Sequence, residues 1–179
     1  MGIVITAWDF LFEKKFDEPA FYHRDSRLMD KQSKIAVSMA RSLFTKVKGA
    51  ELQSENIGIV LFNNIGPIES ITEYNLALKG KGYIGVNPGK FPNIMPSTLL
   101  SRVAIEMKAK GPCVPLLSTK ENKHVLMYAI EQITLGRCCA MILIHINKAN
   151  NCFGCFIEDE FMCYKRGINP RLIFMEEGR

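Results

Sequence analysis

The chain has 179 residues, of which 47% are hydrophobic, and its 23 Lys and Arg against 18 Asp and Glu give a formal net charge of +5. This length supports one domain with a buried core and excludes two of ordinary size. The hydrophobic runs are roughly four to eight residues long, against about 20 for a membrane-spanning helix, so we expect no membrane association. The weak, dispersed positive charge comes without a basic block or a nucleic-acid motif, so we expect no nucleic acid partner.

The first residues and the cysteines both predict a cytoplasmic protein with reduced thiols. Residues 1–6 lack the basic segment and the long apolar core of a secretory signal. Six cysteines in a chain of this size favour free thiols over a disulfide framework. Cys152 and Cys155 have C-x-x-C spacing, with Cys163 and His145 nearby, which is compatible with a metal or redox site, but a second pair is missing. Ordinary core or loop positions explain these cysteines better, so we predict neither a metal nor a cofactor.

In the first third of the chain, residues 3–8 predict a short strand, and residues 11–27 have no clear period and predict an irregular insertion. From Asp30 or Ser33 onward, apolar residues recur at three- and four-residue spacing, which predicts a helix that packs on a sheet. Residues 57–62 form a continuous apolar run, which is typical of a strand covered on both faces.

In the middle of the chain, Gly66 and Pro67 predict the start of a helix that reaches toward Leu78, followed by a long irregular connection rich in Gly and Pro. The pattern then predicts a helix over 97–107, a strand over 114–117, a helix over 125–133 and a strand over 140–144. This alternation implies crossover connections, so we predict an α/β fold, with a mainly parallel sheet and helices on both faces, in a single domain over residues 1–179. The segments 153–157 and 172–175 are strand-like, but the pattern does not place residues 147–179 in the sheet.

Seven segments occur in the order and spacing of landmarks of the β-ketoacyl synthases, and the sequence resembles the amino-terminal domain of that family. They are residues 2–6, 27–33, 57–61, 87–92, 103–105, 110–112 and 129–137. The resemblance is clearest over residues 2–146. It implies half of a thiolase-like α/β/α layered domain, because active members carry two related halves and this chain matches one.

The resemblance also implies a truncated, catalytically degenerate member. In active enzymes a nucleophilic cysteine lies at a strand-to-helix turn shortly after a Gly-Pro pair, where the helix dipole favours a thiolate. Counting forward from that pair places Lys120 at this position, and counting back from the next helix places Thr119 there. Neither is cysteine. The family's catalytic histidines belong to the second half, and none of the three histidines here matches a catalytic motif.

The same turn leaves one catalytic alternative open. Ser118, with Thr119 or Lys120, could act as a nucleophile beside His124 as a base. The simpler interpretation is a helix cap followed by a solvated first turn, with His124 either packed against the protein or facing water. We therefore keep catalysis at this turn as the weaker hypothesis.

Two further surfaces follow from the resemblance. The family's loop that matches residues 91–96 lies near its dimer contact and substrate channel, so Phe91 and Met95 are expected to line an acyl or aromatic pocket, or else to belong to a rigid proline-rich loop. The family's strand before the nucleophile turn pairs across a two-fold axis, which predicts a dimer interface at Val114, Leu116 and Ser118. Pro115 complicates this interface because proline cannot donate to a strand ladder.

Two functions from different classes remain. The first is a non-catalytic protein that resembles the chain-length-factor partners of ketosynthases in polyketide or fatty-acid-type biosynthesis. It would form a homodimer, or a heterodimer with a full ketosynthase, and could bind a chain attached to acyl carrier protein. The second is a small thiolase-fold acyltransferase or thioester hydrolase that uses the turn from Ser118 to His124. We favour the first, with no condensing activity expected from the chain alone.

Overall fold

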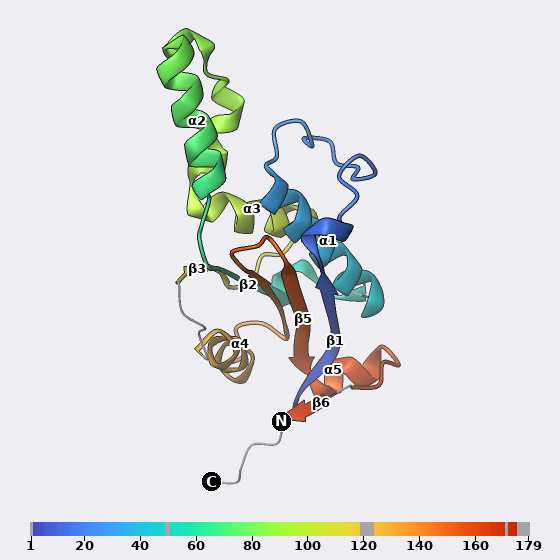
Figure 1. The fold of residues 1–179 in the computed structure, drawn as a ribbon. Helices are drawn as coiled ribbons and strands as arrows, with labels where there is room; N and C mark the ends of the chain where they lie inside the picture. Colours follow the sequence, from blue (N-terminus) through green and yellow to red (C-terminus); the bar gives the residue numbers. More distant parts are fainter. Residues whose placement is uncertain (1, 49–50, 119–123, 171, 175–179) are drawn as a thin grey trace.

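A mixed six-stranded sheet in the order β3-β2-β4-β5-β1-β6 organises the chain (Figure 1). The computed structural model describes residues 2–48, 51–118, 124–170 and 172–174. The strands are β1 (Ile3–Leu11), β2 (Ile57–Asn63), β3 (Cys113–Leu117), β4 (Ala140–Ile146), β5 (Cys152–Asp159) and β6 (Leu172–Phe174). The α-helices are α1 (Lys31–Lys46), α2 (Ile68–Lys81), α3 (Pro96–Met107), α4 (His124–Thr134) and α5 (Glu160–Lys165). Short 3-10 helices are η1 (Glu13–Lys15), η3 (Ser54–Asn56), η4 (Tyr83–Gly85) and η5 (Pro88–Ile94).

The α/β class and the helices on both faces are confirmed, but the sheet is not mainly parallel. Strands β3, β2 and β4 pair in parallel, whereas β4-β5, β5-β1 and β1-β6 pair antiparallel. The reason lies after β4, where the tight turn of residues 147–151 can only join antiparallel neighbours. This turn and the strands that follow also place the predicted strand-like segments over residues 153–157 and 172–174, whereas residues 171 and 175–179 lie outside the described part of the chain.

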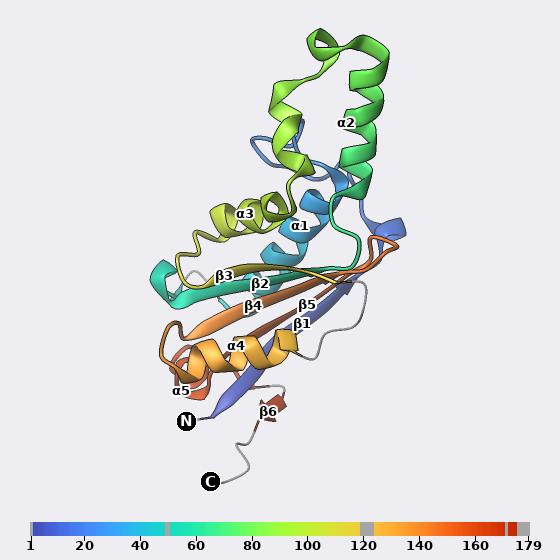
Figure 2. The ribbon, with the colours of Figure 1, turned by 90° about the vertical axis from the view of Figure 1, so that its left-hand side faces the viewer.

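Two apolar layers enclose the sheet. On one face α1 and α3 pack against residues such as Ile59, Ile142 and Phe156, and on the other face α4 packs against Val60 and Met141. Helix α1 begins after Asp30, whose carboxylate accepts a hydrogen bond from the N–H of Ser33 at 2.8 Å. Figure 2 shows the two helical layers on either side of the sheet.

The chain between β2 and α3 projects away from the sheet as an arm, which consists of α2, η4 and η5 (Figures 1 and 2). Helix α2 buries none of its residues, so it is held by its two ends and by the returning η5. The helix predicted after Gly66 and Pro67 is therefore present but lies outside the core.

Among the described residues, no helix is both long enough and apolar enough to cross a bilayer.

Candidate functional site

The carboxyl ends of the three parallel strands β2, β3 and β4 meet at one edge of the sheet, which is where open α/β sheets bind ligands. Polar residues follow the apolar runs there: Asn63 and Asn64 at the end of β2, Ser118 after β3, and His145 near the end of β4. The chain direction therefore brings Asn64 close to Ser118 and His145, which follow it by 54 and 81 residues in the sequence.

Asn64 ties these three strand ends to one another. Its backbone N–H donates to the carbonyl of Ile146 at 3.1 Å, and its Nδ2 donates to the carbonyl of Ser118 at 3.0 Å. Its Oδ1 lies 2.7 Å from Nε2 of His145. Because Nδ2 is the donor to Ser118, Oδ1 is left as an acceptor, so Nε2 of His145 carries the proton in this contact. The imidazole also lies against the ring of Phe62, with 4.8 Å between the centroids.

A second, buried chain of amides fixes the base of the arm. Nδ2 of Asn63 donates to Oε1 of Gln32 at 3.0 Å, Nε2 of Gln32 donates to Oδ1 of Asn150 at 2.8 Å, and Nδ2 of Asn150 donates to Oε1 of Glu69 at 3.1 Å. Oδ1 of Asn63 accepts from both N–H groups of residues 65–66. The chain thus connects β2, α1, the turn after β4 and the first turn of α2, and each amide within it is satisfied.

A shallow cavity of about 590 Å³, widely open to solvent, lies beside Asn64 at this edge. Most of its wall is apolar, and the polar residues among those that line it are Asn64, Ser118 and Lys148. An apolar wall with a few polar groups is typical of sites for small organic ligands. This combination suits an acyl chain whose polar end meets a hydroxyl or an ammonium group. The lining residues are Asn64, Ile65, Ile68, Leu117, Ser118 and Lys148.

The residues predicted for the nucleophile turn are only partly described. Ser118 directly follows β3 and lines the cavity, while His124 is the exposed first residue of α4. Thr119 and Lys120 lie outside the described residues. The Ser118-to-His124 pairing therefore stays a prediction.

Phe91 and Met95 are found on the arm rather than at the cavity. Phe91 belongs to η5 and makes an edge contact with Tyr74 of α2, with ring centroids 6.0 Å apart. Met95 precedes α3 and lines a much smaller pocket of about 10 Å³. Both side chains are about half exposed. Their role in acyl binding stays a prediction.

The predicted dimer strand β3 is an edge strand of the sheet. Its Val114 and Leu116 pack on the α4 side. The N–H of Ser118 donates to the carbonyl of Asn63 at 3.2 Å, and the carbonyl of Pro112 accepts from the N–H of Ile59 at 2.8 Å. The backbone N–H and C=O groups of the even-numbered residues in β3 therefore point toward β2. Pro115 consequently faces the open edge, where proline is tolerated in sheets.

The C-x-x-C spacing does not form a metal or redox pair. Cys152 and Cys155 lie three residues apart on β5, so their thiols point to opposite faces of the sheet and belong to different core clusters. Desolvation by burial raises the pKa of Cys155 to about 12, and it raises the pKa of Cys152 further still. In the part of the chain that the structure describes, no group of three or more His, Cys, Asp or Glu side chains could hold a metal ion.

The arrangement of strands and helices matches solved ketosynthases. A chain of AntDE:AntF (apo), a type II PKS acyl-carrier protein in complex with its ketosynthase bound to the hexaketide, matches with a TM-score of 0.85 at 12% identity, over 98% of this chain and 67% of that chain. This chain has the ketosynthase fold. A β-ketoacyl synthase from Burkholderia phymatum STM815 matches with a TM-score of 0.78 at 14% identity, over 96% of this chain and 62% of that one.

The ishigamide ketosynthase/chain length factor also matches, with a TM-score of 0.71 at 16% identity, over 90% of this chain and 63% of that one. Two of these three solved chains are thus covered over less than two thirds of their own length. No protein-family model and no curated protein matches the sequence. The thiolase-like ketosynthase architecture expected from the sequence is confirmed at the level of the fold.

The sequence pattern missed the residues that organise the site. In the sequence, His145 stands out only as a neighbour of Cys152 and Cys155, and Asn64 and Lys148 belong to no motif. The available signal was the position of polar residues directly after the two most apolar strands, which marks the binding edge of a parallel sheet.

Proposed function

We propose that this chain is a non-catalytic ketosynthase-like partner protein in polyketide or fatty-acid-type biosynthesis, which binds a ketosynthase or a chain carried by acyl carrier protein. The fold supports the class, since the similar solved structures include a ketosynthase/chain length factor and an acyl-carrier protein in complex with its ketosynthase. The cavity beside Asn64 supports a role in holding an acyl group, because it combines an apolar wall with a few polar groups.

The observation that carries the non-catalytic part is the position of the cysteines. Condensation of this type needs a thiolate that holds the acyl group as a thioester. No cysteine occurs between Cys113 and Cys138, so the turn from β3 to α4 has no thiol. Cys113 itself starts β3, where desolvation raises its pKa and disfavours the thiolate.

The proposed partner contact is the open edge of β3, used either for a second copy or for a full ketosynthase. The backbone N–H groups of Cys113 and Leu117 face this edge, whereas Pro115 between them has none. A partner strand can therefore accept hydrogen bonds from β3 on both sides of Pro115 but not at Pro115 itself. This pattern favours a short run of backbone hydrogen bonds supplemented by side-chain contacts.

The test of the main proposal is an assay of condensation with acyl- and malonyl-carrier protein, using the chain alone and the chain mixed with a full ketosynthase. We expect no β-ketoacyl product from the chain alone, and a change in product length or yield when it is added to its ketosynthase partner. Product formed by the chain alone would refute the proposal. Sedimentation of the mixture would show whether the two proteins associate.

A second candidate function is that of a small thiolase-fold acyltransferase or thioester hydrolase that uses the turn from Ser118 to His124. The observation in its favour is that Ser118 lines the cavity together with Lys148. Loss of thioester turnover in Ser118→Ala and His124→Ala, with turnover retained in the exposed-serine control Ser101→Ala, would establish this function. Equal turnover in all four proteins, or none in the wild type, would exclude it.

A further inference from the structure

A bulge in β1 turns a row of aromatic side chains toward the α4 face of the sheet. The register of β1 against β5 shifts between Ile5 and Ala7. Before the shift Ile3 and Ile5 pack on the α4 side, and after it Ala7 packs on the α1 side, where Asp9 bonds Lys46 at 2.7 Å. The extra residue therefore reverses the alternation, and the even-numbered residues that follow face the α4 side.

The result is an exposed aromatic patch, which consists of Trp8, Phe10, Phe12 and Phe153. Phe10 pairs directly with Phe153 of β5, and the rings of Phe10 and Phe12 lie 4.5 Å apart. The four residues are 52%, 43%, 48% and 39% exposed, respectively. Since aromatic side chains present about 150–250 Å² each, the exposed part amounts to roughly 270–450 Å², or about 360 Å² at the mid-range value. A contiguous apolar patch of that size is comparable to the largest apolar patch of a typical monomer, which is often functional.

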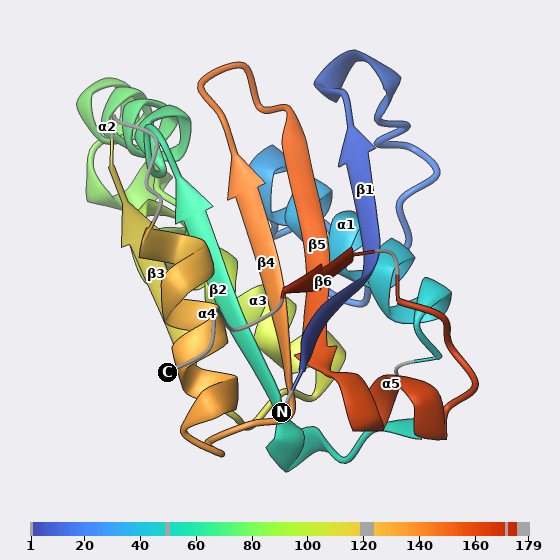
Figure 3. The same ribbon diagram turned by 90° about the horizontal axis from the view of Figure 1, so that it is seen from below.

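The open part of this face is about one helix wide. Figure 3, which looks onto the α4 side, shows α4 in front of one half of the sheet and no helix in front of the upper parts of β5 and β1. A helix is about 10 Å across and adjacent strands are about 4.8 Å apart, so one helix covers about two strands. On the opposite face two helices, α1 and α3, share the same sheet. The patch thus occupies the place of a second helix.

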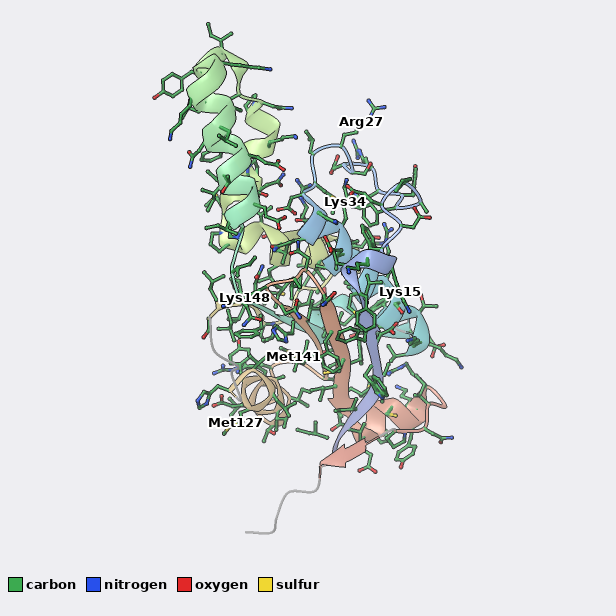
Figure 4. All side chains as sticks on the ribbon, in the orientation of Figure 1. Lys15, Arg27, Lys34, Met127, Met141 and Lys148 are labelled. Atoms are coloured by element: carbon green, nitrogen blue, oxygen red, sulfur yellow. The ribbon has the colours of Figure 1, made fainter. Side chains whose placement is uncertain are left out.

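Helix α4 itself carries an apolar side chain that the core does not use. Ala129 and Ile133 are buried against the sheet, whereas Met127 on α4 is 62% exposed, and Leu135, directly after the last residue of the helix, is 55% exposed. Figure 4 labels Met127 on α4, on the side away from the sheet, and Met141 between α4 and the sheet. The helix therefore offers apolar surface both to its own sheet and outward.

We propose that two copies of this chain associate through the α4 face, with α4 of each copy covering the aromatic patch of the other. Each copy supplies one patch and one helix, so the contact satisfies the self-complementarity of a two-fold dimer. A stable interface buries about 800 Å² per partner, about twice what the patch alone offers, and the outer face of α4 supplies the rest. This contact uses a different surface from the edge of β3, and it does not depend on the proposed function.

The first experiment uses Trp8, which is the only tryptophan in the chain. Sedimentation equilibrium of the 179-residue chain is expected to give twice the 20.2 kDa chain mass. Over the same concentration range, Trp8 emission is expected to shift to shorter wavelength and acrylamide quenching to fall, with the same midpoint as the change in mass. A monomer at tens of micromolar, or a dimer with unchanged Trp8 emission, would overturn the proposal.

Variants on the two sides of the contact separate this interface from its alternatives. Phe10→Lys in the patch and Met127→Glu on α4 are each expected to weaken association at least tenfold. Ile84→Lys, at the fully exposed tip of the arm, is the matched control and is expected to change nothing. Leu117→Lys tests the edge of β3, and loss of the dimer in this variant alone would assign the contact to that edge and overturn the proposal.

A mixture of Phe10→Lys and Met127→Glu tests the pairing itself. The mixed dimer places the new lysine opposite the new glutamate in one contact and retains the wild-type residues in the other. Mixed association is therefore expected to be stronger than self-association of either variant. Circular dichroism of each variant establishes that it folds, and mixed association no stronger than that of the weaker variant would show that α4 does not meet the patch.

Discussion

The buried thiols predict a specific loss of stability at alkaline pH. Desolvation by burial and, to a smaller extent, the neighbouring Cys139 raise the pKa of Cys138 from an ordinary 9.0 to about 11. Burial alone raises the pKa of Cys155 to about 12. Both pKa values are higher in the folded chain than in the unfolded chain. Their contribution to stability is therefore complete below about pH 9 and is lost as the pH rises from there toward the folded-state pKa values.

The size of the loss follows from the ionised fractions. At pH 10 a thiol of pKa 9.0 in the unfolded chain is about 90% ionised, whereas Cys138 and Cys155 in the folded chain are about 10% and about 1% ionised. Because pH 10 lies one unit above the unfolded-state pKa and below both folded-state values, each thiol lowers the free energy of unfolding by about 1.4 kcal/mol between pH 8 and pH 10. The two thiols together lower it by about 3 kcal/mol. At a urea slope of about 2 kcal/mol/M, the urea concentration at the unfolding midpoint is expected to fall by about 1.4 M.

The assay is urea unfolding at pH 8 and pH 10 for the wild type and for the double variant Cys138→Ala/Cys155→Ala. All other titrating groups are common to both proteins, so the double variant is expected to lose about 3 kcal/mol less than the wild type over this range. Val60→Ala, which removes volume from the same core cluster without removing a thiol, is the control and should follow the wild type. Equal losses in the wild type and the double variant would refute the assignment of raised pKa values to these thiols.

Three further substitutions test the packing by urea unfolding at neutral pH. Arg166→Met leaves the carboxylate of Glu158 buried without its charged partner, so it is expected to cost about 3–5 kcal/mol, and a loss below about 1 kcal/mol would contradict a buried ion pair. Gly154→Ala places a Cβ about 2.6 Å from a side chain of α1 and is expected to cost about 1–3 kcal/mol, whereas the control Gly80→Ala meets no atom within 4 Å and should stabilise by about 0.5–1 kcal/mol. Asp30→Ala removes the cap of α1 and is expected to cost about 1 kcal/mol, with no change indicating that the cap is not formed in solution.

Local signals in the sequence were sufficient for most of the elements. The apolar runs at 57–62 and 140–144 correspond to β2 and β4, and Asp30 caps α1 as the pattern indicated. Gly66 and Pro67 precede α2. These features depend on residues a few positions apart, which is the range over which hydrophobic period and capping act.

The order of the strands and the content of the site could not be read in the same way. The antiparallel half of the sheet depends on β1 pairing with β5, more than 140 residues later, and the bulge after Ile5 leaves no mark on an alternating pattern. Because the sequence does not reveal this bulge, it also does not predict that Trp8 is exposed. The contacts of Asn64 with Ser118 and His145 join three distant segments, so they exist only once the parallel strands are aligned.

The pairing of β1 also sets a schedule for folding during synthesis. Strand β1 leaves the ribosome before β5, its nearest neighbour in the sheet, which begins about 140 residues later, and at about 5–20 residues per second this interval lasts about 7–30 s. Throughout that time the β-branched and aromatic residues of β1 have no native strand to pair with, which is the condition under which nascent chains recruit chaperones or aggregate. The pulling force that a folding nascent chain exerts on the ribosome should therefore rise only after β5 has left the exit tunnel.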